Sequence, residues 1–136
     1  MILPMDRTVL VDTSALVEFL NDGNQAVANE VDRVLSAHMT TCDAVVMELT
    51  AGARSESDLQ SIKSLLAMGH NESVTSVDFE IAATLYRTAR RSGVTVRSML
   101  DCVIAAVAVR LGIPILHNDR DFDALASCTE VRIHSY

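Results

Sequence analysis

Short apolar, β-branched runs alternate with longer stretches of helical periodicity along most of the chain. The short runs predict strands at residues 8–11, 39–42, 73–75, 115–117 and 131–133. The periodic stretches predict helices at residues 14–20, 25–37, 43–51, 57–68, 76–91 and 102–111. Strands that alternate with helices predict a parallel α/β sheet covered by helices. Ligands of such sheets collect beyond the carboxyl ends of the strands.

Capping and turn residues mark the ends of the predicted helices. Thr75-x-x-Asp78 and Ser98-x-x-Asp101 have capping-box spacing, and Asp43 stands where an N-cap is expected. Glycine and proline then end the last two of these helices, at Gly93, Gly112 and Pro114. No repeat, linker or low-complexity segment interrupts the pattern, so a single domain over residues 1–136 is expected.

The composition agrees with a compact domain. Of the 136 residues, 49% are hydrophobic and 21% are charged, and no uncharged run is long enough to span a membrane. Residues 1–5 are too short for the core of an export signal, so a cytoplasmic location is expected. The three cysteines, Cys42, Cys102 and Cys128, are far apart and are expected to be reduced and mostly buried.

The net charge limits how the protein could bind nucleic acid. Eleven basic and eighteen acidic residues give −7, which is the wrong sign for binding over the whole surface. Any such site must therefore be local. Four arginines fall in one short stretch, where each one could equally belong to a solvated helix face: Arg87, Arg90, Arg91 and Arg97. Arg97, near the start of the helix that carries Asp101, is the best candidate for binding phosphate.

Five acidic residues are placed where they could converge. Asp12 follows the first predicted strand, Asp119 and Asp121 follow the strand at 115–117, Asp101 opens a helix, and Glu48 lies inside an apolar helix. If they meet at one edge of the sheet, their repulsion raises at least one pKa unless a cation neutralises them. Carboxylate oxygens favour Mg²⁺ or Mn²⁺. The pattern is therefore a hypothesis for a metal site.

Each acid also has a purely structural interpretation. Asp12 could cap its helix, Asp101 could complete the capping box begun by Ser98, and Glu48 could face solvent. Asp121 lies three residues after Asn118 and could complete a capping box begun by Asn118. Spacing alone leaves these alternatives open.

The residues around the acids resemble a known family. The resemblance lies in four blocks, VLVDTSAL (9–16), MEL (47–49), RSMLDCVIAA (97–106) and LHNDRDF (116–122). In order and spacing they are similar to the motifs of PIN domains, and the last two to those of VapC toxins. The resemblance covers residues 9 to about 133. It implies a PIN-like three-layer α/β/α sandwich with a central, mainly parallel sheet.

The resemblance also implies an activity. VapC toxins are metal-dependent endoribonucleases, and Asp12, Glu48, Asp101 and Asp119 match their catalytic acidic quartet. Mg²⁺, with Mn²⁺ as a possible substitute, would be held by Asp12, Asp101 and Asp119, with Asp121 as an auxiliary ligand. The hydroxyl groups of Thr13 or Ser14 could contact the substrate.

Partners are implied in the same way. A VapB-type antitoxin would wrap the toxin with a basic tail and place an arginine among the carboxylates. Because only 4% of residues are aromatic and none is Trp, a structured RNA such as tRNA or rRNA is expected rather than unpaired bases read one by one. Apolar helices between residues 45 and 66 indicate a homodimer.

Other functions fit less well. Asp119, Asp121, Asp123 and Glu130 have the spacing of a calcium-binding EF-hand loop, but Ala124 replaces the required glycine. A phosphorylatable receiver domain needs a lysine late in the sheet, and the only lysine is Lys63. A non-toxin RNA-processing nuclease or an inactive RNA-binding PIN module would share the fold; the length, which leaves no room for an appended RNA-binding domain, favours the toxin.

Overall fold

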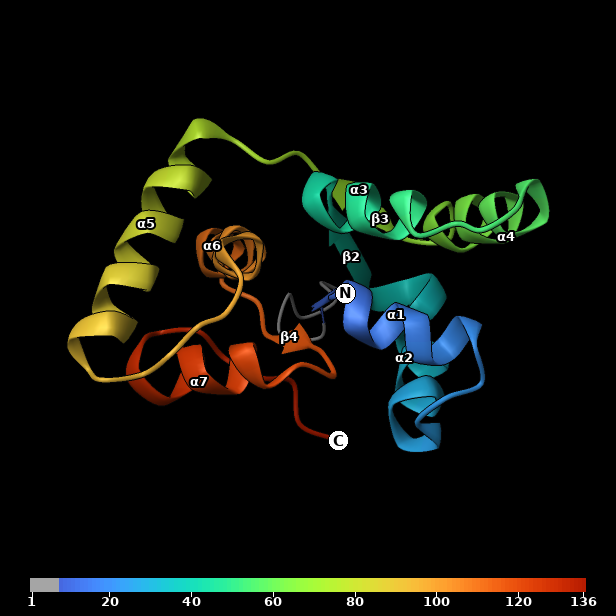
Figure 1. Ribbon diagram of the computed structural model, residues 1–136. Coiled ribbons are helices and arrows are strands. Elements are labelled where there is room, and N and C mark those ends of the chain that lie inside the picture. Colours follow the sequence, from blue (N-terminus) through green and yellow to red (C-terminus); the bar gives the residue numbers. More distant parts are fainter. Residues whose placement is uncertain (1–7) are drawn as a thin grey trace, which may run out of the picture.

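Four parallel strands form the centre of the protein (Figure 1). The structure is a computed structural model that describes residues 8–136, except for the side chains of residues 36 and 37. The strands are β1 (Val9–Val11), β2 (Met39–Cys42), β3 (His70–Glu72) and β4 (Ile115–Leu116), in the order β3-β2-β1-β4. Strand β1 pairs with β2 and β4, so segments from both ends of the chain lie next to each other in the sheet.

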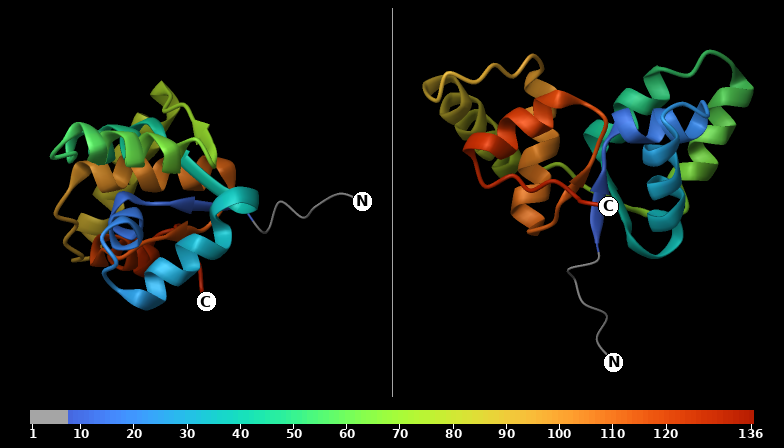
Figure 2. Two further views of the ribbon diagram at one scale, coloured as in Figure 1. Left: turned by 90° about the vertical axis from the view of Figure 1, so that its right-hand side faces the viewer. Right: turned by 90° about the horizontal axis from the view of Figure 1, so that it is seen from below.

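Helices cover both faces of this sheet. They are α1 (Thr13–Leu20), α2 (Gln25–His38), α3 (Asp43–Ala51), α4 (Glu56–Leu66), α5 (Ser76–Arg91), α6 (Met99–Leu111) and α7 (Arg120–Cys128). The right-hand view of Figure 2 shows α1–α4 on one side of the strands and α5–α7 on the other. The expected three-layer α/β/α architecture is therefore confirmed.

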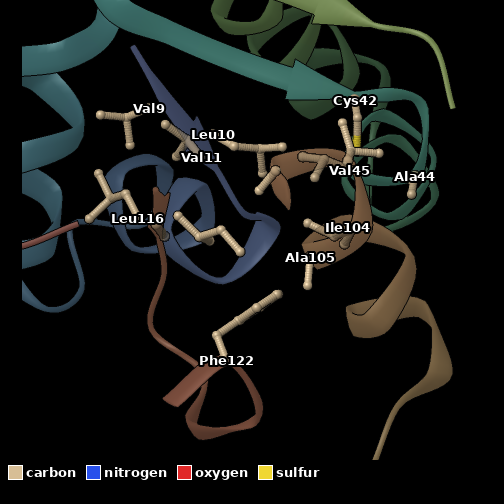
Figure 3. Packing of buried hydrophobic residues seen from close by; sticks show 14 of the residues in the cluster. Val9, Leu10, Val11, Cys42, Ala44, Val45, Ile104, Ala105, Leu116 and Phe122 are labelled. Atoms are coloured by element: carbon tan, nitrogen blue, oxygen red, sulfur yellow. The ribbon is translucent and has the colours of Figure 1, made fainter. Parts of the chain in front are cut away.

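Three of the four strands are buried on both faces, including Thr40 and Thr41 of β2. All residues of β1, β2 and β4 are buried, as parallel strands between two helical layers must be. Helix α6 is buried continuously from Cys102 to Ala108, because it packs against the sheet and also against its neighbouring helices. Figure 3 shows side chains of β1, α3, α6 and α7 meeting in one core, with Phe122 fully buried.

The third strand differs from the prediction. It is formed by residues 70–72 and not by 73–75. Strand β3 is at the edge of the sheet, where polar residues are tolerated on both faces. The residues after it are used differently: the N–H of Val74 donates to Asp43, and Thr75 forms a true capping box with Asp78 at the start of α5.

Two further predictions near the carboxyl end need correction. Of the strand expected at 131–133, only Ile133 pairs with the sheet, through a single bridge to Ile115. Helix α7, which the pattern did not assign, spans residues 120–128 and occupies the positions of the supposed EF-hand loop. A helix cannot wrap around a calcium ion as that loop does, so this alternative is excluded.

The cysteines agree with the expectation that they are reduced and mostly buried. Cys42 and Cys102 are buried, Cys128 is half-buried, and all three are free thiols. In the described part of the chain, no helix is long and apolar enough to cross a membrane. The segment assessed for an export signal, residues 1–5, lies outside the described residues.

A buried ion pair joins the edge strand to two helices. The Arg110 guanidinium, at the end of α6, donates from Nε to Asp78 Oδ1 (2.7 Å) and from Nη2 to Asp78 Oδ2 (3.1 Å). It also reaches Glu72 of β3 at 3.3 Å. Although burial raises the pKa of the Asp78 carboxyl, Arg110 and Thr75 together hold it below its usual value. Asp78 is therefore a charged group with no contact to solvent.

Replacing Arg110 by Met is expected to lower the free energy of unfolding by about 3 kcal/mol, because Asp78 would stay buried without its partner. Urea denaturation at neutral pH measures the change. The control, Arg87→Met, removes an exposed arginine of α5 and should change stability by less than ~0.5 kcal/mol. Equal effects of the two substitutions would contradict the structural role assigned to the pair.

Candidate metal centre

Carboxylates gather where the strands and helices meet at the carboxyl edge of the sheet. Asp12 follows β1, Asp119 follows β4, and Asp101 lies in the first turn of α6. Side-chain oxygens of Asp101, Asp119 and Asp121 all lie within 4.8 Å of one another. Within residues 8–136 this close group does not include Asp12 or Glu48, but both carboxylates are near enough for their charges to affect it.

Asp12 is both a helix cap and a member of the cluster. Its Oδ2 accepts hydrogen bonds from the Ser14 N–H (2.9 Å) and the Ser14 Oγ (2.6 Å). Its Oδ1 is buried and has no hydrogen-bond partner, the one such side-chain atom among the described residues. Burial raises the pKa of Asp12 despite the hydrogen bonds from Ser14. The capping interpretation is thus correct for one oxygen and leaves the other unexplained.

Glu48 lies on α3, near the charges of Asp12 and Asp119, and does not simply point to solvent. It is half-buried on α3, and the Thr13 Oγ1 donates to its Oε1 at 3.1 Å. Burial raises the pKa of Glu48, and the negative charges of Asp12 and Asp119 act in the same direction. Thr13 and Glu48 also line a cavity of about 500 Å³ between α1, α3 and α4.

Asp101 and Asp121 share a proton. Burial, a hydrogen bond to Asp121 and the neighbouring negative charges raise the pKa of Asp101 to about 8. Burial also acts to raise the pKa of Asp121, but hydrogen bonds from Asp101 and Arg97 lower it overall. Without a metal, Asp101 therefore carries the proton and Asp121 the charge.

The capping interpretations of these two residues are wrong. Ser98 is the N-cap of α6, but its side chain makes no cap hydrogen bond. The N-cap of α7 is Asp119, whose Oδ1 accepts from the Asp121 N–H at 2.9 Å, and not Asn118. Similarly, Cys42 and not Asp43 is the N-cap of α3.

Arg97 pairs with the acids. Its Nη2 lies 3.0 Å from Asp119 Oδ1 and its Nε lies 3.2 Å from Asp121 Oδ1. The backbone N–H groups of Arg97 and Ser98 donate to the second oxygen of Asp121, at 3.1 and 3.2 Å. The sequence drew attention to Arg97 as a phosphate ligand, and this pairing with carboxylates was not expected from it.

Further hydrogen bonds hold the backbone beside the acids, and they were not predicted from the sequence. The Asp119 N–H donates to His117 Nδ1 (2.9 Å), and the other ring nitrogen lies 3.2 Å from Asp123 Oδ1. His117 is therefore a hydrogen-bonded structural residue. Ser14 Oγ accepts from the Asn118 N–H at 2.8 Å, which links the ends of β1 and β4.

The donor set fits a hard divalent cation. Asp12 Oδ1 is a buried acceptor without a partner beside several other carboxyl groups, an arrangement that is costly unless a cation or a proton compensates it. Every side-chain atom that the cluster offers is an oxygen, which matches the preference of Mg²⁺ and Mn²⁺. Asp12, Asp101, Asp119 and Asp121 are the residues that could hold the ion.

Comparison with known proteins agrees with this geometry. A family model for the PIN domain matches residues 9–127. The chain belongs to the PIN domain family. It is 39% identical over 132 residues to the VapC ribonuclease Mb1587 of Mycobacterium bovis and to ribonuclease VapC11 of Mycobacterium tuberculosis, covering 94% of this chain and 98% of each relative. This identity places it in the VapC group of the PIN domain family.

Solved structures share the PIN fold. The DNA-bound VapBC complex of Salmonella typhimurium has a chain that matches with a TM-score of 0.76 at 17% identity, covering 93% of this chain and 96% of that one. VapC20 of Mycobacterium tuberculosis, described as a sarcin–ricin loop cleaving toxin, matches with a TM-score of 0.66 at 21% identity, covering 92% and 99%. At these identities the likeness concerns the fold alone.

The shared proton predicts how stability depends on pH. Asp101 has a pKa of about 8 in the fold, against 3.8 for an ordinary aspartate, so between these values the folded chain holds a proton that the unfolded chain has released. In EDTA, the Tm should therefore fall as the pH rises from about 5 to about 8. Asp101→Asn should flatten this slope and melt above the wild type at the higher pH. A steeper slope in the variant would contradict the assignment.

Proposed function

We propose that the protein is a metal-dependent endoribonuclease and the toxin of a VapBC-type pair. The observation that carries this proposal is the buried Oδ1 of Asp12, which has no partner within the described residues and lies beside the carboxyl cluster. The membership in the PIN domain family and the identity to two VapC ribonucleases support it.

The proposed roles follow from the position of each residue. Asp12, Asp101 and Asp119, with Asp121 as an auxiliary ligand, would hold Mg²⁺ or Mn²⁺. When bound, such an ion neutralises phosphate charge and lowers the pKa of water at the site. Glu48, whose pKa burial raises, is suited to accept a proton from the attacking water.

The remaining site residues would contact or shape the substrate site. Thr13 holds Glu48 beside the cavity, and Ser14 holds Asp12 and the loop after β4, so both hydroxyl groups already have partners in this structure. Arg97 is 54% exposed and lies at the start of α6, where backbone N–H groups also favour an anion. Because Asp121 already occupies the N–H groups of Arg97 and Ser98, the exposed guanidinium of Arg97 is the group we assign to the scissile phosphate.

A structured RNA is the substrate class we favour. The net charge of −7 disfavours RNA binding over the whole surface, so we place the binding at Arg97 and the cavity, and the low aromatic content provides few stacking surfaces. Folded RNA such as tRNA or rRNA can be recognised by its shape through a small number of phosphate contacts.

The proposed partner is a basic VapB-type antitoxin. The acidic chain and the carboxylates at its sheet edge are complementary to a basic segment that carries arginine. A homodimer remains a prediction. Val45, Leu49 and Ile62, in the stretch that indicated it, are buried in the chain's own core, whereas Met47 is 55% exposed.

Cleavage of RNA tests the proposal directly. Purified protein incubated with total cellular RNA should give discrete fragments with 5′-phosphate ends in Mg²⁺ or Mn²⁺, and none in EDTA. Asp12→Asn and Asp101→Asn should each reduce the rate ~10²-fold or more, because an ion contributes several kcal/mol to the transition state. Thermal melting should show that both variants stay folded.

Asp32→Asn is the matched control for this experiment. It removes one charge from an exposed position on α2, outside the carboxyl cluster, and should cleave like the wild type. Fragments that persist in EDTA would contradict a metal-dependent reaction. Folded, metal-binding protein that cleaves no RNA would favour an inactive RNA-binding PIN module, and fragments limited to precursor RNAs would favour a processing nuclease.

Inhibition is expected when the antitoxin is present. Co-expression with the product of a neighbouring short reading frame should give a complex that elutes as one species in size-exclusion chromatography. The complex should cleave RNA far more slowly than the free chain, since arginine would compete with the ion and the phosphate for the same carboxylates. A complex with undiminished cleavage would contradict the toxin–antitoxin assignment.

A further inference from the structure

Arg97 pairs with two of the carboxylates that could hold a metal ion. Its guanidinium bridges Asp119 (3.0 Å) and Asp121 (3.2 Å), two of the three residues in the closest carboxyl group. We propose that Arg97 is an internal competitor of the metal, which holds Asp119 in the metal-free protein and releases it when a divalent cation binds. This inference rests on the metal site of the proposed function.

The two ion pairs of Arg97, with Asp119 and with Asp121, are not held equally firmly. Asp121 is 3% exposed; two backbone N–H groups donate to its Oδ2, and the Nε of Arg97 donates to its Oδ1. Asp119 is 29% exposed, and its Oδ1 also accepts from the Asp121 N–H. The contact between Arg97 Nη2 and Asp119 can therefore break while both carboxylates keep backbone partners. It is the ion pair that a metal ion would displace.

Electrostatics make the two cations exclude each other. A guanidinium and a divalent ion on the same oxygen, Asp119 Oδ1, would repel strongly because they lie only a few ångströms apart. In the metal-free state Arg97 offsets part of the repulsion among the acids, so it stabilises that state and weakens metal binding.

Once displaced from Asp119, the guanidinium of Arg97 can bind a phosphate instead. With Nε still bound to Asp121, the freed Nη2 remains beside the cluster with a donor that has lost its acceptor. A phosphate oxygen can replace the carboxylate there. Arg97 would thus bind RNA phosphate only after the metal has bound, which couples the two binding events through one side chain.

Metal binding can be measured without reference to RNA cleavage. Mn²⁺ alone is titrated into the full chain at neutral pH and low salt, and free Mn²⁺ is quantified by electron paramagnetic resonance. Arg97→Met should bind Mn²⁺ roughly three- to tenfold more tightly than the wild type, as expected for removal of a partly exposed competing charge. Arg97→Lys, which keeps the charge, should lie between the two. The difference should shrink at high salt.

Arg33→Met is the matched control. Arg33 is a 62% exposed arginine that pairs with buried Glu30 on α2, so its removal changes the net charge equally without touching the cluster. Equal or weaker Mn²⁺ binding by folded Arg97→Met would overturn the proposal, as would an equal gain in Arg33→Met. If Arg97→Met does not fold, the Mn²⁺ affinities of Arg97→Gln and Arg97→Lys are compared. Tighter binding by Arg97→Gln supports the proposal, and equal or weaker binding overturns it.

The outcome is separable from that of the proposed function. Absence of Mn²⁺ binding in every variant would refute the metal site itself, and with it this inference. Tighter binding by Arg97→Met in a protein that cleaves no RNA would support the role of Arg97 and refute only the nuclease assignment.

Discussion

Repulsion among carboxyl groups at one edge of the sheet is the constraint on which the rest of the site depends. Parallel strands all end at the same edge, so the residues that follow β1 and β4 are brought together whether or not their charges are compatible. Burial strengthens this repulsion, and two features offset it: the proton between Asp101 and Asp121, and the guanidinium of Arg97. The hydrogen bond from Ser14 holds the Asp12 carboxylate, and the bond from the Asp119 N–H to His117 holds the backbone that carries Asp119.

Most of the architecture could be predicted from the sequence because it follows from local patterns. The buried strands β1 and β4 are continuous apolar runs, and the capping box of Thr75 and Asp78 forms as its spacing indicated. Strand β3 could not be predicted in the same way. Its residues are polar, and it exists because its backbone pairs with β2, which is a tertiary contact with no local signal.

The site shows the same division between local and distant contacts. The positions of Asp12, Asp101 and Asp119 after strands and at helix starts indicated where these acids could converge, and spacing alone left structural alternatives open. The behaviour of Ser98 was not predictable, because the capping box that its spacing allows competes with interactions from α7 that the spacing does not contain. The pairing of Arg97 with Asp121, 24 residues further along the chain, likewise depends on how α6 and α7 pack.

The arrangement of the chain also governs when the cluster can first exist during synthesis. Ser14 and Asn118, whose hydrogen bond joins the two sides of the site, are 104 residues apart. Asp12 therefore leaves the ribosome long before Asp119 and Asp121. A chain whose translation stops before β4 lacks two of the three carboxylates of the close group. The order of translation thus delays the assembly of the cluster until the segment that begins with β4 has emerged.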